Sequence, residues 1–499
     1  MQLLTLIEPL VPYKWQNDQV LNKIEDMEIT SIEMDSRKVT AGAMFVCIEG
    51  FHVDGHQYVQ QAVEKGAKVI VAQKPVQTDI PVIIVPDTRR TLAVVADTFY
   101  QHPTQKLRVI GVTGTNGKTT VTHLIEQILE DAQHKTGRIG TIGAKIGNNV
   151  EEVANTTPES SELQNVFHRM SGAGCEYAVI EASSHAIHMG RLRGTNIGTA
   201  VFTNLTQDHL DYHGTMEEYQ RAKGLLFAQL GNTYDPQDRK YAILNADDEA
   251  HTYFRDITPA QVVTYGIDNH ADIRAKNIQL TSQGITFTVE YYKGSETVRL
   301  QMLGKFNVYN ALAAIAAALV EGISLTSIKH SLAQVKGVPG RLEVVDEGQP
   351  YTVLVDYAHT PDSLKNVLQT VQEFAIGKVF CVIGCGGDRD RTKRPLMAQI
   401  ATAHADYAIL TSDNPRSEEP QVILNDMKNG LAQTGTPQER YTCIVDRQTA
   451  IDTAIQQASP GDIVVIAGKG HETYQQLKDE TIHFDDREVA RQAIQNNKK

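Results

Sequence analysis

Cysteine is scarce in this chain of 499 residues, which has five cysteines and no Cys-x-x-Cys pair. An odd, scattered set of this kind indicates neither a disulfide framework nor a zinc site. Four of the five lie in apolar, strand-like segments and are expected to be core thiols, namely Cys47, Cys175, Cys381 and Cys443. Cys385 differs because it lies in a glycine-rich loop.

Long apolar runs are also missing. The longest one beside a helical pattern, residues 311–320, is half of the roughly 20 residues that cross a bilayer. The first 15 residues have no basic start and no small-residue cleavage site, so they do not read as a secretory signal. We therefore expect no membrane span and a cytoplasmic enzyme.

Basic residues are fewer than acidic ones, with 47 Lys and Arg residues against 60 Asp and Glu residues, which gives a net charge of −13. Nucleic-acid partners require a basic face, so we expect no nucleic acid as a partner. Proline is modest at 17 residues, and 41% of the chain is hydrophobic, which excludes disorder as the main character of the chain.

A length of 499 residues, at ~150 residues per domain, predicts roughly three domains. We place them at residues 1–105, 106–337 and 338–499. In the first, short β-branched runs at 69–72 and 82–85 surround helical stretches such as 57–65, which predicts a small α/β domain.

The middle region resumes with an apolar run at 107–112 that ends in a glycine loop and a helix. Further apolar runs at 177–180, 199–202 and 241–244 alternate with helical segments, as in a parallel sheet covered on both faces. Between about 262 and 303 the pattern becomes alternating, which predicts a small antiparallel patch.

The last region predicts a Rossmann-like, doubly wound sheet. Its strands are expected at 352–355, 379–383, 407–410, 443–445 and 463–466. In such sheets the sites gather at the carboxyl ends of the strands. The polar stretches that follow these strands are 356–359, 384–394, 412–416 and 468–472.

The glycine loop carries the parts of a phosphate site. Backbone N–H groups at a helix start face phosphate oxygens, while a lysine adds charge and a hydroxyl can hold magnesium. The spacing departs from the general G-x-x-x-x-G-K-[ST] pattern, because Gly111 stands one place too early. Glu181 ends the next strand, from which a carboxylate could reach magnesium at the loop. The loop residues are Gly114, Thr115, Asn116, Gly117, Lys118, Thr119 and Thr120.

Eight ordered motifs resemble the Mur ligase family. They are TGTNGKTT, VIEASSHA, NLTQDHLDYHG, AKGLLF, GKFNVYNALAA, DYAHTPDSL, GCGGDRDRTKRP and SDNPR. The resemblance runs from Asp35 to Glu472. It implies three domains: a small N-terminal α/β domain that binds the UDP-sugar, a central P-loop ATPase-like domain and a Rossmann-like C-terminal domain that binds the amino acid.

The resemblance also implies a reaction. An ATP-dependent ligase of this family activates the terminal carboxylate of UDP-MurNAc-L-Ala-D-Glu as an acyl phosphate, and an amine then displaces phosphate. The Asp-Asn-Pro-Arg motif is typical of the branch that adds meso-2,6-diaminopimelate in cytoplasmic peptidoglycan precursor synthesis. A guanidinium suits the second carboxylate of this amino acid. The implied cofactors are Mg²⁺ and the co-substrate ATP, and the implied form is a monomer acting on small molecules.

By resemblance, the catalytic residues are Lys118, Lys223, Glu181 and His209. Thr119, Glu181, His209 and Lys223 would surround magnesium, with Lys223 carbamylated to N6-carboxylysine, an oxygen-ligand anion that suits this metal. The nucleotide would be contacted by the glycine loop and by Asn307, Arg341 and Asp356 across the second and third domains, so that domain closure completes the site.

The resemblance implies two further substrate sets. The UDP-MurNAc-dipeptide would contact Ser36, Asn155, Thr156, Thr157, Ser183 and Arg191. One departure from the better-known Gram-negative sequences is Met189, which stands where they have a glutamine contact. The diaminopimelate would contact Arg389, Asp413, Asn414, Pro415, Arg416, Gly468 and Glu472.

Three alternatives stay open from the sequence. The chain could be an L-lysine-adding paralogue, a sibling ligase such as folylpolyglutamate synthetase, or a catalytically silent nucleotide-binding regulator. The Asp-Ser-Arg motif at 35–37 and the Asp-Asn-Pro-Arg motif argue against the sibling ligase. The presence of Lys118, Glu181, His209 and Lys223 together argues against the regulator. His359 and several carboxylates are candidates for the base that deprotonates the attacking amine.

Overall fold

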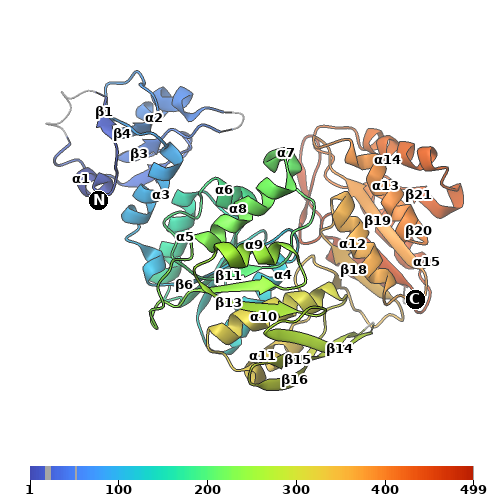
Figure 1. Cartoon of the computed structure of the whole chain (residues 1–499). Coiled ribbons are helices and arrows are strands. Elements are labelled where there is room, and N and C mark those ends of the chain that lie inside the picture. The colour runs from blue at the N-terminus through green and yellow to red at the C-terminus, as the bar shows by residue number, and fades with distance from the viewer. Residues whose placement is uncertain (17–23, 51–52, 282, 498–499) are drawn as a thin grey trace. The chain divides into compact units, whose positions relative to one another are not determined.

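The computed structural model describes residues 1–16, 24–50, 53–281 and 283–497 (Figure 1). The chain divides into two compact units, Met1–Ile273 with Ala313–Ser324, and Arg274–Leu312 with Leu325–Lys499. The expected α/β architecture is confirmed, because largely parallel sheets alternate with helices in both units. Among the described residues, no helix combines the length and apolar character needed to span a membrane.

The N-terminal segment forms a five-stranded sheet in the order β1-β5-β4-β3-β2. Neighbouring strands from β2 to β5 are parallel, and β1 is antiparallel to β5. All side chains of β3 and β4 are buried, as expected for strands covered on both faces. The strands are β1 (Lys14–Trp15), β2 (Ser31–Glu33), β3 (Ala43–Val46), β4 (Val69–Ala72) and β5 (Val82–Ile84), and the helices are α1 (Leu3–Ile7), η2 (Gly55–Tyr58), α2 (Val59–Glu64) and α3 (Thr88–Phe99).

The central sheet of the first unit runs in the order β13-β12-β11-β6-β10-β7-β8-β9. It is parallel from β13 to β7, and β8 and β9 extend it as antiparallel strands. The sequence did not predict β7, and β13 is parallel although it begins the stretch expected to be antiparallel. The strands are β6 (Arg108–Thr113), β7 (Thr136–Gly140), β8 (Gly143–Ile146), β9 (Asn149–Glu151), β10 (Tyr177–Glu181), β11 (Ile197–Phe202), β12 (Tyr241–Asn245) and β13 (Gln261–Gly266).

Aromatic residues pack helices onto one face of this sheet. The ring of Phe202 in β11 lies edge-on to Phe254, with centroids 4.7 Å apart, and Phe254 stacks on Phe227 at 5.0 Å. All three rings are buried in one apolar cluster, which fixes the helix that carries Lys223 against the sheet. The helices are α4 (Lys118–Asp131), α5 (Ser160–Gly172), α6 (Ser184–His188), α7 (Leu210–His213), α8 (Met216–Ala228) and α9 (Ala250–Ile257).

The second unit begins with an antiparallel meander, in which β15 pairs with both β14 and β16. This part of the expected antiparallel patch is confirmed. Two helices follow, and the first of them contains the apolar run at 311–320 noted in the sequence. The elements are β14 (Ile273–Thr281), β15 (Gly284–Tyr291), β16 (Gly294–Leu300), α10 (Phe306–Val320) and α11 (Leu325–Gln334). The first residue of β14 and the part of α10 from Ala313 on belong to the first unit.

A six-stranded sheet in the order β17-β18-β22-β19-β20-β21 forms the C-terminal part. It is parallel except for β17, which confirms the doubly wound prediction. Alternate residues of β22 face opposite layers: Ile463 and Val465 lie in one apolar cluster, and Val464 and Ile466 lie in the other. The strands are β17 (Glu343–Val344), β18 (Thr352–Asp356), β19 (Val379–Cys385), β20 (Tyr407–Ser412), β21 (Tyr441–Cys443) and β22 (Ile463–Ala467).

Helices cover both faces of this sheet, and a short hairpin follows its last strand. The strand expected at 443–445 ends at Cys443 instead, because Asp446 accepts from the backbone N–H of Thr449 and caps the next helix. The remaining elements are α12 (Pro361–Gln372), α13 (Lys393–His404), α14 (Pro420–Thr434), α15 (Arg447–Gln457), β23 (Tyr474–Gln476), β24 (Thr481–His483) and α16 (Asp486–Asn497).

The cysteines behave largely as core residues. Cys47, Cys175 and Cys381 are buried, and Cys443 is half-buried at the edge of a core cluster. Cys385, expected in a glycine-rich loop, is in fact the buried last residue of β19, and burial raises the pKa of its thiol to about 12. It is therefore a packing residue rather than a reactive thiol.

Candidate active site

The glycine loop joins β6 to α4 and is built around two backbone positions that side chains tolerate poorly. Gly114 has φ +150°, and a Cβ there would lie 1.8 Å from Thr203 Oγ1. Gly117, at φ +86°, is the residue before the helix start at Lys118. Thr203 Oγ1 donates to Asn116 O at 2.6 Å, so the end of β11 fixes the loop. The loop thus presents the N-terminus of α4, an arrangement suited to phosphate.

Lys118 lies over this loop. Its Nζ donates to the carbonyl oxygens of Gly114 at 2.9 Å and Thr115 at 2.8 Å. The ammonium group of Lys118, the backbone N–H groups of the loop and the dipole of α4 would therefore all attract an anion at the same place. Thr119 and Thr120, the next two residues, are buried in the first turn of α4.

Glu181 lies beside the loop because β10 and β6 are adjacent parallel strands, with Glu181 paired to Val112. Its buried carboxylate accepts from Thr119 Oγ1 at 3.0 Å, and from Thr141 N at 2.8 Å and Oγ1 at 3.2 Å. A Cβ on Gly140 would meet Glu181 Oε1 at 2.2 Å, so the glycine that ends β7 makes room for this carboxylate.

Lys223 is a buried lysine of α8 that reaches the same loop. Only 1% of it is exposed, and its Nζ donates to Gly114 O at 2.8 Å and lies 4.4 Å from the centre of the Tyr219 ring. Burial lowers the pKa of the Lys223 amine well below 10.5, and the nearby Lys118 lowers it further. A neutral amine at this position is a nucleophile as well as a donor.

His209 adds an imidazole to this group. It has φ +54°, a strained conformation for a residue other than glycine, and precedes α7. Its ring centroid lies 4.8 Å from that of His185 and 6.0 Å from that of Tyr219. Burial lowers the pKa of His209, Asp208 opposes this effect, and Lys118 and Lys223 lower the pKa further. The neutral ring is the form that binds metals.

In the described part of the chain, no three His, Cys, Asp or Glu side chains converge as a metal-binding group. The magnesium set expected from the sequence holds one carboxylate, Glu181, with the Thr119 hydroxyl and the His209 imidazole. Mg²⁺ prefers oxygen ligands. This set therefore fits magnesium only if further oxygens are added, and a carbamate on Lys223 is one source of them.

Several residues expected to bind the UDP-sugar peptide do cluster. Thr157 Oγ1 lies 3.2 Å from Ser183 Oγ, and Arg191 Nη1 donates to Thr157 O at 2.9 Å. The Arg191 guanidinium also pairs with Glu159, at 3.0 Å, and contacts Met189 Sδ at 3.6 Å. Thr157 Oγ1 donates to Glu181 O at 2.6 Å, so this cluster adjoins the glycine loop.

The other three residues of this set are more scattered. Thr156 Oγ1 lies 3.2 Å from Thr141 Oγ1, beside Glu181. Asn155 is exposed in the preceding turn. Ser36 lies in the N-terminal sheet region and donates to Gln61 Oε1 at 2.6 Å.

Within the second unit, two of the expected nucleotide residues lie together. Asp356, at the end of β18, accepts from the backbone N–H groups of Leu342 and Ala358 at 2.7 and 2.8 Å. Burial raises the pKa of Asp356, and Arg341 opposes that shift. The Arg341 guanidinium lies 5.2 Å from the centre of the Tyr357 ring. Asn307 is buried at the start of α10 and donates to Leu303 O at 2.7 Å.

The residues expected to bind diaminopimelate gather where β19, β20 and β22 end. A Cβ on Gly468 would lie 2.8 Å from Asp413 Oδ2, and Asn414 Nδ2 donates to Glu472 Oε2 at 2.9 Å. A Cβ on Gly386 would lie 2.9 Å from Arg416 Nη1 and 3.8 Å from Arg389 Cγ, so both arginines flank one glycine. The carbonyl of Pro415 closely approaches Gly387.

Sequence reasoning missed several supporting residues. Lys469 is fully buried, and its Nζ donates to Asn414 Oδ1 and Glu472 Oε2, each at 3.1 Å. Arg447 is buried too, pairs with Asp486 at 2.7 Å, and donates to Ser412 O and Ala467 O at 3.3 and 3.0 Å. Lys469 lies in the polar stretch 468–472 that the sequence had singled out, so it could have been found there. The sequence around Arg447 offers no such signal.

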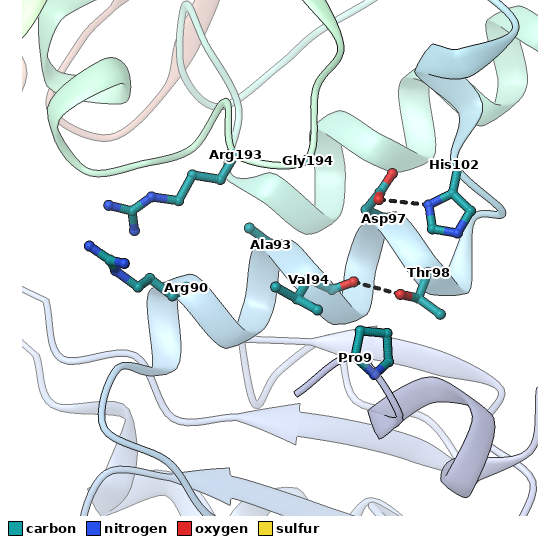
Figure 2. Close-up of a pocket in the computed structure, with 9 residues that line it drawn as sticks. All are labelled: Pro9, Arg90, Ala93, Val94, Asp97, Thr98, His102, Arg193 and Gly194. Atoms are coloured by element: carbon teal, nitrogen blue, oxygen red, sulfur yellow. Dashed lines mark hydrogen bonds and ion pairs between the residues drawn. The ribbon is translucent and has the colours of Figure 1, made fainter. Parts of the chain in front are cut away.

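A cavity of about 300 Å³ is lined by residues outside the sets described above (Figure 2). Arg90 and Arg193 point toward each other at its rim, and Asp87 pairs with both, at 3.2 and 4.0 Å. Burial lowers the pKa of Arg193, and Arg90 lowers it further. The nine residues that line this cavity include none of the expected site residues.

Family models match most of the chain. They are described as the Mur ligase family catalytic domain at residues 28–100, the Mur ligase middle domain at 112–318 and the Mur ligase glutamate ligase domain at 340–470.

Whole-chain comparisons agree with these models. A UDP-N-acetylmuramoyl-L-alanyl-D-glutamate--2,6-diaminopimelate ligase of Geobacillus thermodenitrificans (strain NG80-2) is 56% identical, over 94% of this chain and 95% of the relative. The ligase of the same name from Halalkalibacterium halodurans is 55% identical over 99% of both chains. A solved structure with this name has a TM-score of 0.69 at 36% identity, covering 95% of this chain and 96% of the other. The chain belongs to the Mur ligase family.

Proposed function

We propose that this chain is an ATP-dependent amide ligase that joins meso-2,6-diaminopimelate to the D-Glu carboxylate of UDP-MurNAc-L-Ala-D-Glu. This reaction would serve cytoplasmic peptidoglycan precursor synthesis. The names of its relatives support the proposal, and one observation carries the choice of amino acid. The guanidinium of Arg416 and the side chain of Arg389 flank Gly386, beside Asn414 and Glu472. An amino acid with a second, distal carboxylate suits such a site.

The first chemical step is phosphoryl transfer. A carboxylate is a poor electrophile, so an oxygen of the D-Glu carboxylate attacks the γ-phosphorus of ATP, the bond to the ADP oxygen breaks, and an acyl phosphate forms. Two anions must approach each other in this step, which requires positive charge at the transferred group. Lys118 and the N-terminus of α4 are the groups of this chain that would supply it.

The second step forms the amide. The neutral amine of the amino acid attacks the acyl carbon, the bond to the phosphate oxygen breaks, and the proton lost by nitrogen passes to a base. The cluster of Thr157, Ser183 and Arg191 would hold the UDP-dipeptide, because Arg191 can pair with an anion of that substrate. Thr157 is bonded to the backbone of Glu181, so such binding would place the substrate carboxylate near the glycine loop.

Thr119, Glu181, His209 and a carbamylated Lys223 would hold Mg²⁺. When bound, the ion would neutralise charge on the phosphates and on the transferred group. The chemistry of Lys223 supports the carbamate. Burial favours the neutral form of its amine, whose lone pair can add to the carbon of CO₂, and loss of a proton leaves a carbamate anion.

Two further assignments belong to the proposal. Asn307, Arg341 and Asp356 would contact the nucleotide. Burial raises the pKa of the Asp356 carboxyl group and the Arg341 guanidinium lowers it, which supports placing these two residues at one site. The enzyme would act as a monomer on small-molecule substrates, without nucleic acid.

The deciding experiment uses the purified chain with ATP, Mg²⁺ and UDP-MurNAc-L-Ala-D-Glu, offered either meso-diaminopimelate or L-lysine, with products identified by mass. We expect one tripeptide product, with diaminopimelate, and phosphate release that requires both the UDP-dipeptide and the amino acid. A lysine product alone would assign the lysine-adding activity instead. Absence of phosphate release from folded protein would favour the silent regulator.

A further inference from the structure

Arg394, at the start of α13, is a buried arginine that the proposed chemistry does not use. It is fully buried, and its guanidinium contacts three separate segments, at Gly386, Glu418 and Asp426. It donates to Glu418 Oε1 at 2.7 Å and Oε2 at 3.0 Å, to Asp426 Oδ2 at 2.8 Å, and to Gly386 O at 3.3 Å. The paired contact with Glu418 is bidentate, the geometry that fixes both partners most strongly.

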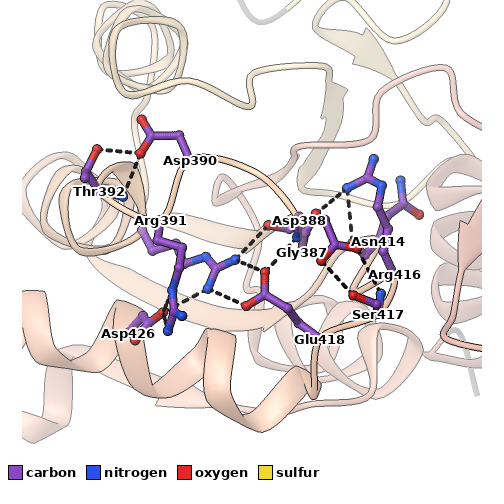
Figure 3. Close-up of polar contacts among 12 residues, drawn as sticks. Gly387, Asp388, Asp390, Arg391, Thr392, Asn414, Arg416, Ser417, Glu418 and Asp426 are labelled. Atoms are coloured by element: carbon purple, nitrogen blue, oxygen red, sulfur yellow. Dashed lines mark hydrogen bonds and ion pairs between the residues drawn. The ribbon is translucent and has the colours of Figure 1, made fainter. Parts of the chain in front are cut away.

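Glu418 has a second partner across the site. Its Oε1 also accepts from the backbone N–H of Asp388 at 2.7 Å. Asp388 in turn accepts from Ser417 Oγ at 2.7 Å and from Ser417 N at 3.1 Å. The loop after β19 and the loop after β20 are therefore tied together through Glu418 (Figure 3), and Arg394 donates to Gly386 O in the first loop and to Glu418 in the second.

These two loops carry the arginines proposed to bind diaminopimelate. Gly387 N donates to Asn414 O at 2.9 Å, and Arg416 Nη1 donates to Gly387 O at 2.8 Å. Asp388 and Arg416 both have φ +52°, a left-handed conformation that non-glycine residues adopt only when their surroundings hold them. Arg389, which follows Asp388, depends on the same loop conformation.

We propose that Arg394 and Glu418 are positioning residues, which hold the loops at 386–390 and 413–418 so that Arg389 and Arg416 are spaced for one dicarboxylate amino acid. The inference rests on the proposed function for the identity of that amino acid. Neither Arg394 nor Glu418 is proposed to contact the substrate. A purely structural reading of Arg394 is the competing interpretation, because a buried arginine between two carboxylates also stabilises the domain.

Asp426 separates the two readings. It lies on α14 and shares the Arg394 guanidinium with Glu418, and its other cationic partner is the exposed Arg391, at 2.9 Å. Its contact with Arg391 reaches the end of the loop after β19, but none of the contacts described for Asp426 joins that loop to the loop after β20. Asp426→Asn therefore removes one anionic partner of Arg394 but keeps the contacts of Arg394 with Gly386 and Glu418, whereas Glu418→Ala removes the connection between the two loops.

The test compares Glu418→Ala, Glu418→Gln and Asp426→Asn by melting temperature and by KM for diaminopimelate, ATP and UDP-dipeptide. We expect Glu418→Ala to raise the KM for diaminopimelate by about tenfold or more, since small displacements of binding groups have such effects. The other two KM values should stay unchanged. Glu418→Gln, which keeps an oxygen for Asp388 N–H, should recover part of the loss. Asp426→Asn should lower the melting temperature with an unchanged KM for diaminopimelate.

Amide hydrogen exchange gives a readout that does not depend on activity. Glu418→Ala should speed exchange at 386–390 and 413–418, and Asp426→Asn should not. Equal effects of the two variants on exchange and on KM would overturn the positioning role, as would no effect of Glu418→Ala. If Glu418→Ala does not fold, Glu418→Gln is compared with Asp426→Asn instead, and the effects on hydrogen exchange and on the KM for diaminopimelate decide in the same way. A wild-type enzyme that does not use diaminopimelate would contradict the proposed function, while the exchange result would still decide on the loop connection.

Discussion

The side-chain nitrogen of Lys223 lies 2.8 Å from the carbonyl oxygen of Gly114, 109 residues earlier in the chain. The same helix makes a second contact with the loop, because Tyr219 Oη lies 3.1 Å from Thr115 Oγ1. Helix α8 is thus attached to the glycine loop at two points. A chemical change at Lys223 is therefore transmitted directly to the loop.

Lys223→Ala should be nearly inactive and partly rescued by short carboxylates, because the missing part is an oxyanion. Lys223→Arg should also be inactive and should not be rescued, since it keeps a cation that cannot be carbamylated.

The pH dependence of Lys223 carbamylation has a definite sign. Below the folded pKa the amine is protonated and does not react with CO₂. Because that pKa lies well below 10.5, reactivation of CO₂-depleted enzyme at a constant concentration of dissolved CO₂ should accelerate as pH rises toward the folded pKa and level off well before pH 10.5. Full activity of Lys223→Ala, or CO₂-independent wild-type activity, would contradict the carbamate.

Lys118→Ala should abolish ATP turnover and leave binding of the UDP-dipeptide largely intact. The lysine contacts the glycine loop, whereas the cluster proposed for that substrate uses Thr157, Ser183 and Arg191. Phosphate release and calorimetric binding of the UDP-dipeptide measure the two effects separately. Equal loss of both in folded protein would refute this division of roles.

Gly140→Ala should reduce kcat by about 10²-fold, because the added Cβ would lie 2.2 Å from Glu181 Oε1 and displace the carboxylate. Gly172→Ala is the matched control. It lies at the end of α5 with nothing within 4 Å of the added Cβ, and should leave kcat unchanged. The control should raise stability by about 0.5–1 kcal/mol, as alanine does in helices. Wild-type kcat in Gly140→Ala would remove Glu181 from the proposed chemistry.

Arg416→Ala should lose most diaminopimelate activity, mainly through a raised KM if the contact is equally strong in the ground and transition states. Wild type should reject lysine by about 10⁴-fold, since lysine leaves a guanidinium without its anion. The measurement is kcat/KM for both amino acids with both proteins. An unchanged ratio would show that Arg416 does not select the substrate.

Acid should weaken the domain through Glu418. Bonding to Arg394 lowers the pKa of Glu418 from 4.5 to about 2. A carboxyl group whose folded pKa is depressed stabilises the fold above its unfolded pKa, and this contribution is lost as pH falls toward the folded value. Unfolding followed between pH 4.5 and 2 should therefore show a steeper loss of stability in wild type than in Glu418→Gln. Parallel curves would mean that Glu418 is not strongly paired.

Much of this architecture was predictable because apolar runs and strand ends obey simple geometry. The sequence places Glu181 at the end of a strand next to the glycine loop, and adjacent parallel strands put it 3.0 Å from Thr119. The polar stretches after β19, β20 and β22 meet for the same reason.

Other features depend on contacts that have no local signal. Strand β7 was missed because Gly137 and Gly140 interrupt its apolar pattern, and both serve side chains from elsewhere: Met170 packs where a Cβ of Gly137 would lie, and Glu181 where that of Gly140 would lie. The Arg394 and Arg447 pairs were not predicted, because their partners lie 24 to 39 residues away.

The order of the C-terminal sheet has a consequence for synthesis of the chain. Strand β22 lies between β18 and β19, yet it follows every other strand of this sheet in the sequence. Until β22 is made, β18 and β19 each have an unpaired side, and unpaired edges of this kind invite pairing with other chains. The nascent domain therefore cannot complete its sheet while the ribosome is still making the segment before β22, and during this interval the open edges of β18 and β19 favour aggregation.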